Sequence, residues 1–143
     1  MEVSGMAVSW DKMAQIVRSA RTIAVVGLSD KPDRPSNEIA RYLQKAGYRI
    51  IPVNPHLAEV LGERAYPSLR EISEHVDVVL IFRRPEAVPP VVEDAIAMGA
   101  PVVWMQPGAE NLDAAARAQA AGLTAVVGMC MRTVHRTLAG ARM

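Results

Sequence analysis

The 143-residue sequence contains a single cysteine, Cys130, and only 4% aromatic residues. One cysteine excludes an internal disulfide and is typical of a protein kept in a reducing compartment, so we expect a cytoplasmic protein. Neither sign of charge predominates, because the sequence has 16 Lys and Arg residues and 15 Asp and Glu residues. This balance gives no broad field toward nucleic acid or an acidic membrane, and we expect neither partner.

Long hydrophobic runs are absent as well. No stretch reaches about 18 uninterrupted apolar residues, the length that a membrane-spanning helix requires. The opening MEVSGMAVSWDKMAQ contains Glu2 and Asp11 and lacks a long apolar core, so it does not resemble a signal peptide. A chain of this length fits one domain, and we expect residues 1–143 to form a single one.

Short apolar runs rich in Val and Ile alternate with helix-like segments. The runs barely alternate in polarity, which is typical of parallel strands covered on both faces. The predicted strands span 22–27, 48–53, 76–82, 101–105 and 123–127, and the predicted helices span 9–20, 36–46, 68–74, 85–98, 110–121 and 131–139. This order predicts an α/β, three-layer domain with a mainly parallel five-stranded sheet.

In such folds ligands bind beyond the carboxyl ends of the strands, near the point where strand order reverses. The first strand is followed by GLSDKPDRPSNEIA, in which Gly27 permits a tight turn and Ser36 is placed as the N-cap of a helix. The first amides of that helix can receive an anion, and Lys31 and Arg34 add positive charge that two aspartates partly cancel. The alternative is a solvated loop in which Ser36 is merely a cap.

Glycine spacing argues against two common nucleotide sites. A dinucleotide-binding chain would show G-x-G-x-x-G and an acidic residue about 20 residues later. Here only Gly27 is present, and Asn54 occupies the place of the carboxylate. The GxxxxGK[ST] motif of a phosphate-binding loop is also missing. The sequence therefore disfavours NAD and provides no motif for an NTPase.

The second and third strand ends offer further candidate contacts. Val53, Asn54 and Pro55 form a rigid turn that could border a flat base or sugar, or could simply reverse the chain. Phe82 and Arg83 follow the third strand, where they could stack on adenine and pair with phosphate. Arginines at helix starts are also commonly solvated.

At the fourth strand end, Gln106 offers a donor and an acceptor, and Gly108 permits close backbone approach. Trp104, within that strand, is predicted to belong to the core. Cys130 follows the fifth strand, and a lone cysteine there is either a small buried apolar residue or a thiol that contacts a ligand. The three histidines, His56, His75 and His135, have no metal-ligand spacing, so no metal site is predicted and each is expected at or near the surface.

Several segments taken together resemble the small stand-alone CoA-binding proteins, whose single domain is similar to the N-terminal CoA-binding domain of the succinyl-CoA synthetase α subunit. The matching segments are TIAVVGLSDKPDRPSNEIARYLQKAGYRIIPVNP, VDVVLIFRRPEAVPPVVEDA, PVVWMQPGAEN and AGLTAVVGMCM. The resemblance implies a Rossmann-like fold with coenzyme A as its ligand.

The resemblance also implies roles for individual residues. Phosphate groups of CoA would lie against Gly27, Leu28, Ser29, Lys31, Arg34 and Ser36. The adenosine would be bordered by Val53, Asn54 and Pro55, and the nucleotide or the start of the pantetheine arm by Phe82 and Arg83. Gln106 and Gly108 would line the later part of the cleft. One departure is that Gly128 and Met129 precede Cys130, where the family carries a polar or acidic residue.

Three functions remain open on these grounds. The leading one is a non-catalytic carrier or sensor of CoA or acyl-CoA, or a subunit that works with a separate synthetase or transferase, because no acid, base and nucleophile set can be assembled. The phosphorylated histidine of the large synthetases has no counterpart among the three histidines. The alternatives are an enzyme that uses the bound acyl-CoA thioester, with Cys130 or a partner supplying the reactive group, and a redox or ligand sensor that binds NAD(P) in the same cleft.

Overall fold

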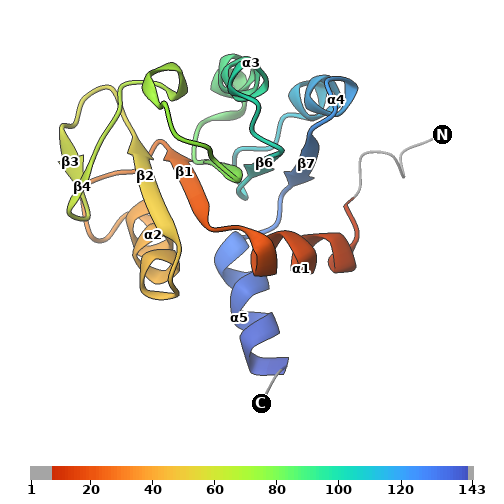
Figure 1. The fold of residues 1–143 in the computed structure, drawn as a ribbon, viewed down its shortest axis with the longest axis horizontal. Helices are drawn as coiled ribbons and strands as arrows, with labels where there is room; N and C mark the ends of the chain where they lie inside the picture. Colours follow the sequence, from red (N-terminus) through yellow and green to blue (C-terminus); the bar gives the residue numbers. More distant parts are fainter. Residues whose placement is uncertain (1–7, 142–143) are drawn as a thin grey trace.

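The computed structural model describes residues 8–141, which form one α/β unit (Figure 1). Its helices are α1 (Trp10–Ser19), α2 (Pro35–Lys45), α3 (Val88–Met98), α4 (Leu112–Ala120) and α5 (Met131–Ala141), with short 3₁₀ turns η2 (Leu69–Glu71) and η3 (Pro85–Ala87). Its strands are β1 (Thr22–Val26), β2 (Arg49–Val53), β3 (Glu59–Val60), β4 (Glu63–Arg64), β5 (Val78–Ile81), β6 (Val102–Met105) and β7 (Thr124–Val127). The segment that was compared with a signal peptide lies partly outside the described residues. Within the described range, every helix is too short or too polar to span a lipid bilayer.

Five strands pair in parallel in the order β2-β1-β5-β6-β7, which confirms the predicted Rossmann-like sheet. After β1 the chain adds β2 on one side, and it then crosses to add β5 on the other side of β1. Strand order therefore reverses between β1 and β5. In sheets of this order, ligands bind at that switch point.

Helices cover both faces of the sheet (Figure 1). Because successive side chains of each strand point to opposite faces, each strand contributes residues to both helical layers. Ile23 and Val25 belong to the core shared with α1, α2 and α5, whereas Ala24 and Val26 belong to the core shared with α3 and α4. Trp104 is fully buried, as predicted, and its indole Nε1 donates a hydrogen bond of 2.7 Å to the carbonyl oxygen of Met129. The three layers thus have two separate apolar cores.

The N-cap that was predicted at Ser36 is wrong. Helix α2 begins at Pro35, and Arg34 occupies the N-cap position without a side-chain hydrogen bond. Proline is favoured at the first helical position, since its φ is already helical and the missing amide would have had no partner. The Ser36 hydroxyl instead accepts a hydrogen bond of 3.0 Å from the backbone N–H of Ser29.

A small hairpin of β3 and β4 was not predicted from the sequence. Each strand has two residues, too few to show a pattern, and Leu61 and Gly62 connect them at φ 56° and 76°. Positive φ at both central residues is the geometry of the tight turns that suit a hairpin. The following Tyr66 pairs with Val53, which places this segment beside the end of β2.

Gly27 is required at the end of β1 for steric reasons. Its φ is 87°, and a Cβ built there would lie 2.1 Å from the carbonyl oxygen of Phe82, which follows β5. That distance is far inside van der Waals contact, and the neighbouring atom is backbone that cannot swing away. An alanine would therefore force the ends of β1 and β5 apart.

We expect Gly27→Ala to lower the free energy of unfolding by at least about 3 kcal/mol, measured by urea denaturation. Gly99→Ala is the matched control, because Gly99 also has a positive φ (78°) but open space where the Cβ would be. The control should cost only the conformational term, about 1–2 kcal/mol. Equal losses in the two variants would contradict the steric argument.

Candidate binding site at the carboxyl ends of the strands

The turn at Gly27 lies at the switch point between β1 and β5. Its N–H donates a hydrogen bond of 2.9 Å to the carbonyl oxygen of Val53, and the N–H of Phe82 donates one of 2.8 Å to the carbonyl oxygen of Val26. The ends of β2, β1 and β5 are thereby held together. The loop that follows Gly27 starts from this fixed point.

Side chains of α2 hold that loop in place. The amide nitrogen of Asn37 donates a hydrogen bond of 2.8 Å to the carbonyl oxygen of Ser29. Arg41 donates to the side-chain oxygen of Asn37 at 2.8 Å and to the carbonyl oxygen of Pro32 at 2.7 Å. Asn37 is only 3% exposed, so its own two hydrogen bonds are partly shielded from water, whereas the hydrogen bond from Arg41 to Pro32 is exposed. Asn37 and Arg41 were missed in the sequence, although their i, i+4 spacing on a predicted helix was a usable signal.

The first turn of α2 carries backbone amides with no capping side chain. The first amides of a helix have no partner within it, and the N-cap residue Arg34 provides no side-chain acceptor. Such a terminus is equivalent to roughly half a positive charge. The structure therefore has an uncapped helix N-terminus close to the Gly27 turn.

A cavity of about 370 Å³ opens where these features meet. It brings together seven residues that the sequence predicted for the site, namely Gly27, Ser29, Arg34, Ser36, Phe82, Arg83 and Gly108. The lining also includes four residues that were not assigned to it, namely Pro35, Arg84, Pro107 and Ala109. No carboxylate is among the lining residues.

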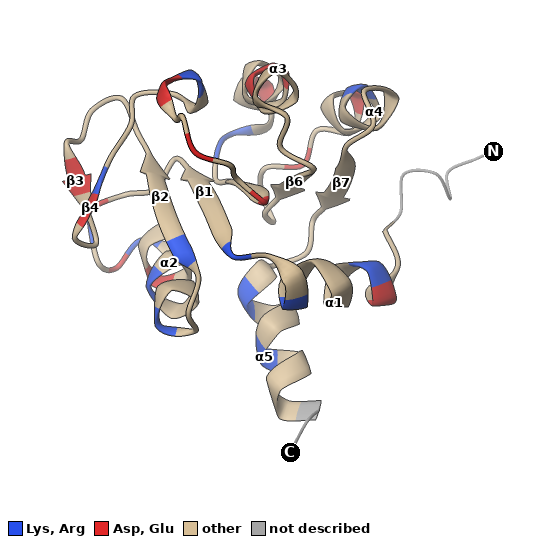
Figure 2. Cartoon of the chain, viewed as in Figure 1, with Lys and Arg blue, Asp and Glu red and all other residues tan. Residues whose placement is uncertain are grey.

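Positive charge is concentrated at this cavity. Arg34 and Arg83 have no ion pair among the described residues, and the Nε atom of Arg83 is buried without a hydrogen-bond partner. Arg84 has a loose ion pair with Glu86, at 3.8 Å. Figure 2 shows the basic segment that leads from β5 toward α3. The cavity thus combines free guanidinium groups with the helix amides.

Gly108 and Glu110 mark the far side of the cavity. The N–H of Gly108 donates a hydrogen bond of 2.9 Å to a carboxylate oxygen of Glu110. The N–H of Gly108 therefore already has an acceptor, and the carboxylate of Glu110 places a negative charge on this side of the cavity. An anion is favoured on the side of Arg34 and Arg83.

The remaining predicted site residues lie outside this cavity. Leu28 is fully buried, Lys31 and Pro55 are exposed, and Val53 lines a neighbouring cavity of about 100 Å³ that shares Arg83. The amide nitrogen of Asn54 donates to the carbonyl oxygen of Leu28 at 3.1 Å. The side chain of Asn54 therefore connects the loops that follow β1 and β2.

Gln106 lies behind the rim, with 2% of its surface exposed. Its Oε1 accepts a hydrogen bond of 2.8 Å from the N–H of Met131 and so satisfies an amide at the start of α5. Burial raises the pKa of the neighbouring Cys130 thiol, but hydrogen bonds from Gln106, Thr133 and Arg132 outweigh burial and lower that pKa overall. The thiol of Cys130 therefore loses its proton more readily than a free cysteine thiol does.

The histidines do not assemble into a metal centre. His56 and His75 are exposed, and half-buried His135 is hydrogen-bonded to the Tyr42 hydroxyl at 2.8 Å. In residues 8–141 no three side chains of His, Cys, Asp or Glu are grouped so that they could hold a metal ion.

Comparisons with known proteins identify the family and related structures. The profile of the family described as "CoA binding domain" matches residues 21–136. An uncharacterized protein of Bacillus subtilis, YneT, is 42% identical over 124 residues, which are 87% of this chain and 92% of that protein. A hypothetical protein from Pyrococcus horikoshii, whose structure has been solved, superposes with a TM-score of 0.91 at 38% identity and covers 94% of this chain and 95% of that one.

A longer enzyme also contains a similar region. The ADP-forming acetate–CoA ligase I of Archaeoglobus fulgidus is 34% identical over 74 residues, which are 52% of this chain but 11% of the ligase. The similarity thus concerns one small part of that ligase. The family match covers most of the chain, and the chain therefore belongs to the CoA-binding-domain family.

Proposed function

We propose that this domain binds coenzyme A or acyl-CoA at the carboxyl ends of its strands, as a non-catalytic carrier, sensor or partner subunit. The observation that supports this most strongly is the cavity where free guanidinium groups adjoin the uncapped start of α2. Family membership favours CoA as the ligand. A reducing, cytoplasmic location would suit both the ligand and the single thiol.

Phosphate groups match the polar atoms of the cavity. The nucleotide end of CoA carries a pyrophosphate and a 3′-phosphate, and hydrogen bonds to charged groups contribute about 1.5–3 kcal/mol each. Arg34 and Arg83 supply the guanidinium groups, and the first turn of α2 supplies the amides. The loop that contains Ser29 is already held by Asn37, so little ordering is needed when the ligand binds.

The smaller cavity beside Arg83 suits the adenine ring. Its lining includes Val26, Val53 and Leu69, which offer apolar surface to a flat base. Arg83 lines both cavities and would lie between the base and the phosphates. In this arrangement Lys31, Asn54 and Pro55, which line neither cavity, would border the ligand from the loops.

Binding without catalysis is favoured by the composition of the cavity wall. Its lining residues include no His, Cys, Asp or Glu, so no general acid, general base or thiol nucleophile faces the cavity. The similar region in the acetate–CoA ligase supports a role beside a separate synthetase or transferase protein. Such a partner would supply the reactive groups.

NADP is the competing ligand in the same cavity. Asn54 directly follows β2, where a dinucleotide-binding domain would have a carboxylate for the ribose hydroxyls of NAD. Its amide nitrogen donates instead to the carbonyl oxygen of Leu28. Arg34 could serve a 2′-phosphate as well as the 3′-phosphate of CoA. Direct measurement decides between them.

We expect calorimetry to show saturable binding of CoA and acetyl-CoA, weaker binding of NADP and none of NAD. Arg34→Gln and Arg83→Gln should each weaken CoA binding by about 1–3 kcal/mol, because each removes a charge-assisted hydrogen bond to phosphate. Lys45→Gln is the matched control, an exposed cation at the opposite end of α2, and should leave affinity unchanged. Tighter binding of NADP than of CoA would refute the assignment.

The Cys130 environment is the observation that favours an acyl-CoA-using enzyme. Hydrogen bonds to the sulfur lower its pKa despite burial, and a thiolate is the reactive form in acyl transfer. Incubation with acetyl-CoA, followed by measurement of released CoA thiol, tests this. Turnover that is lost in Cys130→Ser would replace the non-catalytic proposal.

The thiol pKa itself can be checked. Because the folded pKa lies below the unfolded value, iodoacetamide should alkylate Cys130 with a midpoint at lower pH in the native protein than in urea. By linkage, the unfolded chain binds more protons between the two pKa values, so the free energy of unfolding should rise with pH across that interval. Cys130→Ser should abolish both effects. A native midpoint at or above the midpoint in urea would contradict the hydrogen-bonding argument.

A further inference from the structure

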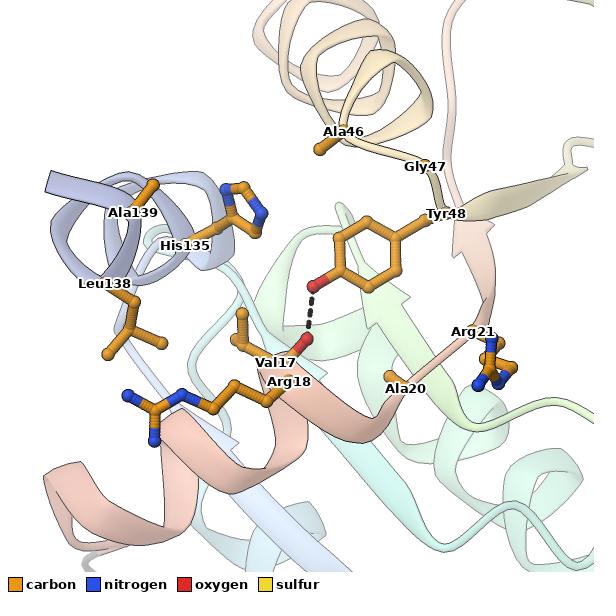
Figure 3. Close-up of a pocket in the computed structure, with 10 residues that line it drawn as sticks. All are labelled: Val17, Arg18, Ala20, Arg21, Ala46, Gly47, Tyr48, His135, Leu138 and Ala139. Carbon is orange, nitrogen blue, oxygen red and sulfur yellow. Dashed lines mark hydrogen bonds between the residues drawn. The ribbon is translucent and has the colours of Figure 1, made fainter. Parts of the chain in front are cut away.

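A second cavity, of about 270 Å³, lies at the opposite ends of the strands (Figure 3). Its walls come from the end of α1, the turn after α2 and one side of α5. Arg21 directly precedes β1 and Gly27 directly follows it, and β1 has five residues. The two cavities are therefore separated by roughly 17 Å, the length of that strand.

Most of the wall of this cavity is apolar or already bonded. Val17, Ala20 and Leu138 contribute aliphatic surface. The Tyr48 hydroxyl donates a hydrogen bond to the carbonyl oxygen of Val17, and the His135 ring lies edge-on to the Tyr48 ring with centroids 5.9 Å apart (Figure 3). Burial and neighbouring Tyr42 raise the pKa of Tyr48 to about 12. Tyr48 therefore stays uncharged.

Two arginines provide the unused polar groups. Arg18 and Arg21 line the cavity, and neither guanidinium has an ion pair or a hydrogen bond among residues 8–141. Elsewhere in the fold, arginines reach carboxylates at short distance, as Arg49 does with Glu74 at 2.7 Å. No Asp or Glu is among the residues that line the cavity. Its charge is thus uncompensated by its own wall.

Helix dipoles offset only part of the positive charge of Arg18 and Arg21. Both α1 and α2 end at the cavity, and each C-terminus is equivalent to roughly half a negative charge. Two guanidinium groups outweigh the two helix ends together. A basic residue in the last turn is expected to complement the dipole. Asp77, outside the wall, accepts a hydrogen bond of 2.8 Å from the backbone N–H of Arg21, but the lining itself carries two guanidinium groups and no carboxylate above an apolar floor.

We propose that this cavity binds a small dicarboxylate, one carboxylate of which pairs with Arg18 and the other with Arg21, while its short aliphatic part packs against Val17 and Leu138. The volume is just below the range of about 300–1,000 Å³ typical of pockets for drug-sized ligands, so the ligand is a small acid rather than a nucleotide. The site is separate from the CoA cavity and does not depend on it.

Titration of ¹⁵N-labelled protein with glutarate, followed by NMR, tests the proposal. We expect saturable shifts at the amides of Ala46, Gly47 and Tyr48 and at Ala139, all of which lie at the cavity. Glutaramide, the uncharged counterpart, should produce none. Inorganic phosphate should bind more weakly, because it lacks the aliphatic part, and equal affinity would overturn the assignment to a carboxylic acid.

Variants separate the cavity from general attraction between charges. Arg18→Gln and Arg21→Gln should each weaken glutarate binding about tenfold. Because both side chains are exposed, neither substitution should disturb the fold. Lys12→Gln removes a cation from the same helix outside this cavity, and it should change nothing. Ala139→Leu keeps both arginines but fills the cavity, so it should also abolish binding.

The absence of saturable shifts at the lining amides would overturn the proposal. Shifts that persist in the double variant Arg18→Gln/Arg21→Gln, or that are lost equally in Lys12→Gln, would do so as well. Arg34→Gln, in the other cavity, should leave glutarate binding unchanged. The two sites can therefore fail or succeed independently.

Discussion

The close approach of Gly27 to the carbonyl oxygen of Phe82 is the constraint on which the binding edge of this domain depends. β1 and β5 are neighbours in the sheet, with Val26 opposite Ile81, and the chain diverges immediately beyond them. Only a residue without a side chain can turn there, because a Cβ on Gly27 would lie 2.1 Å from the carbonyl oxygen of Phe82. This turn directs one loop toward α2 and the other toward Arg83, and the space between them is the cavity.

The loop after Gly27 shows how a polar edge can be ordered before any ligand arrives. Ser36, Asn37 and Arg41, all on α2, satisfy polar groups of the loop with their side chains, at distances of 2.7–3.0 Å. Because Ser36 bonds the loop rather than capping its own helix, the first amides of α2 stay available. The same residue thus stabilises the loop and leaves the helix terminus open to an anion.

The sequence predicted the sheet well because each strand is buried on both faces and appears as an uninterrupted apolar run. It also predicted seven of the residues that line the cavity at one edge, since parallel strands end together. It could not predict how individual polar groups would be used. Gln106 bonds the N–H of Met131, 25 residues away, and Asn54 bonds the carbonyl oxygen of Leu28, 26 residues away. Local patterns carry no information on such tertiary partners.

Net charge misleads in a chain like this one, because the pairing of charges matters more than their sum. The formal net charge of +1 suggests no affinity for anions, yet carboxylates neutralise only some of the arginines. The arginines with close carboxylate partners are Arg49, Arg70 and Arg117, whereas those that line the two cavities without an ion pair among the described residues are Arg18, Arg21, Arg34 and Arg83. A guanidinium kept beside apolar surface and away from carboxylates gains most from an anion that brings its own apolar part. Local pairing, read from the fold, therefore supports the two proposed anion sites, one at each end of β1, where the composition gives no sign of them.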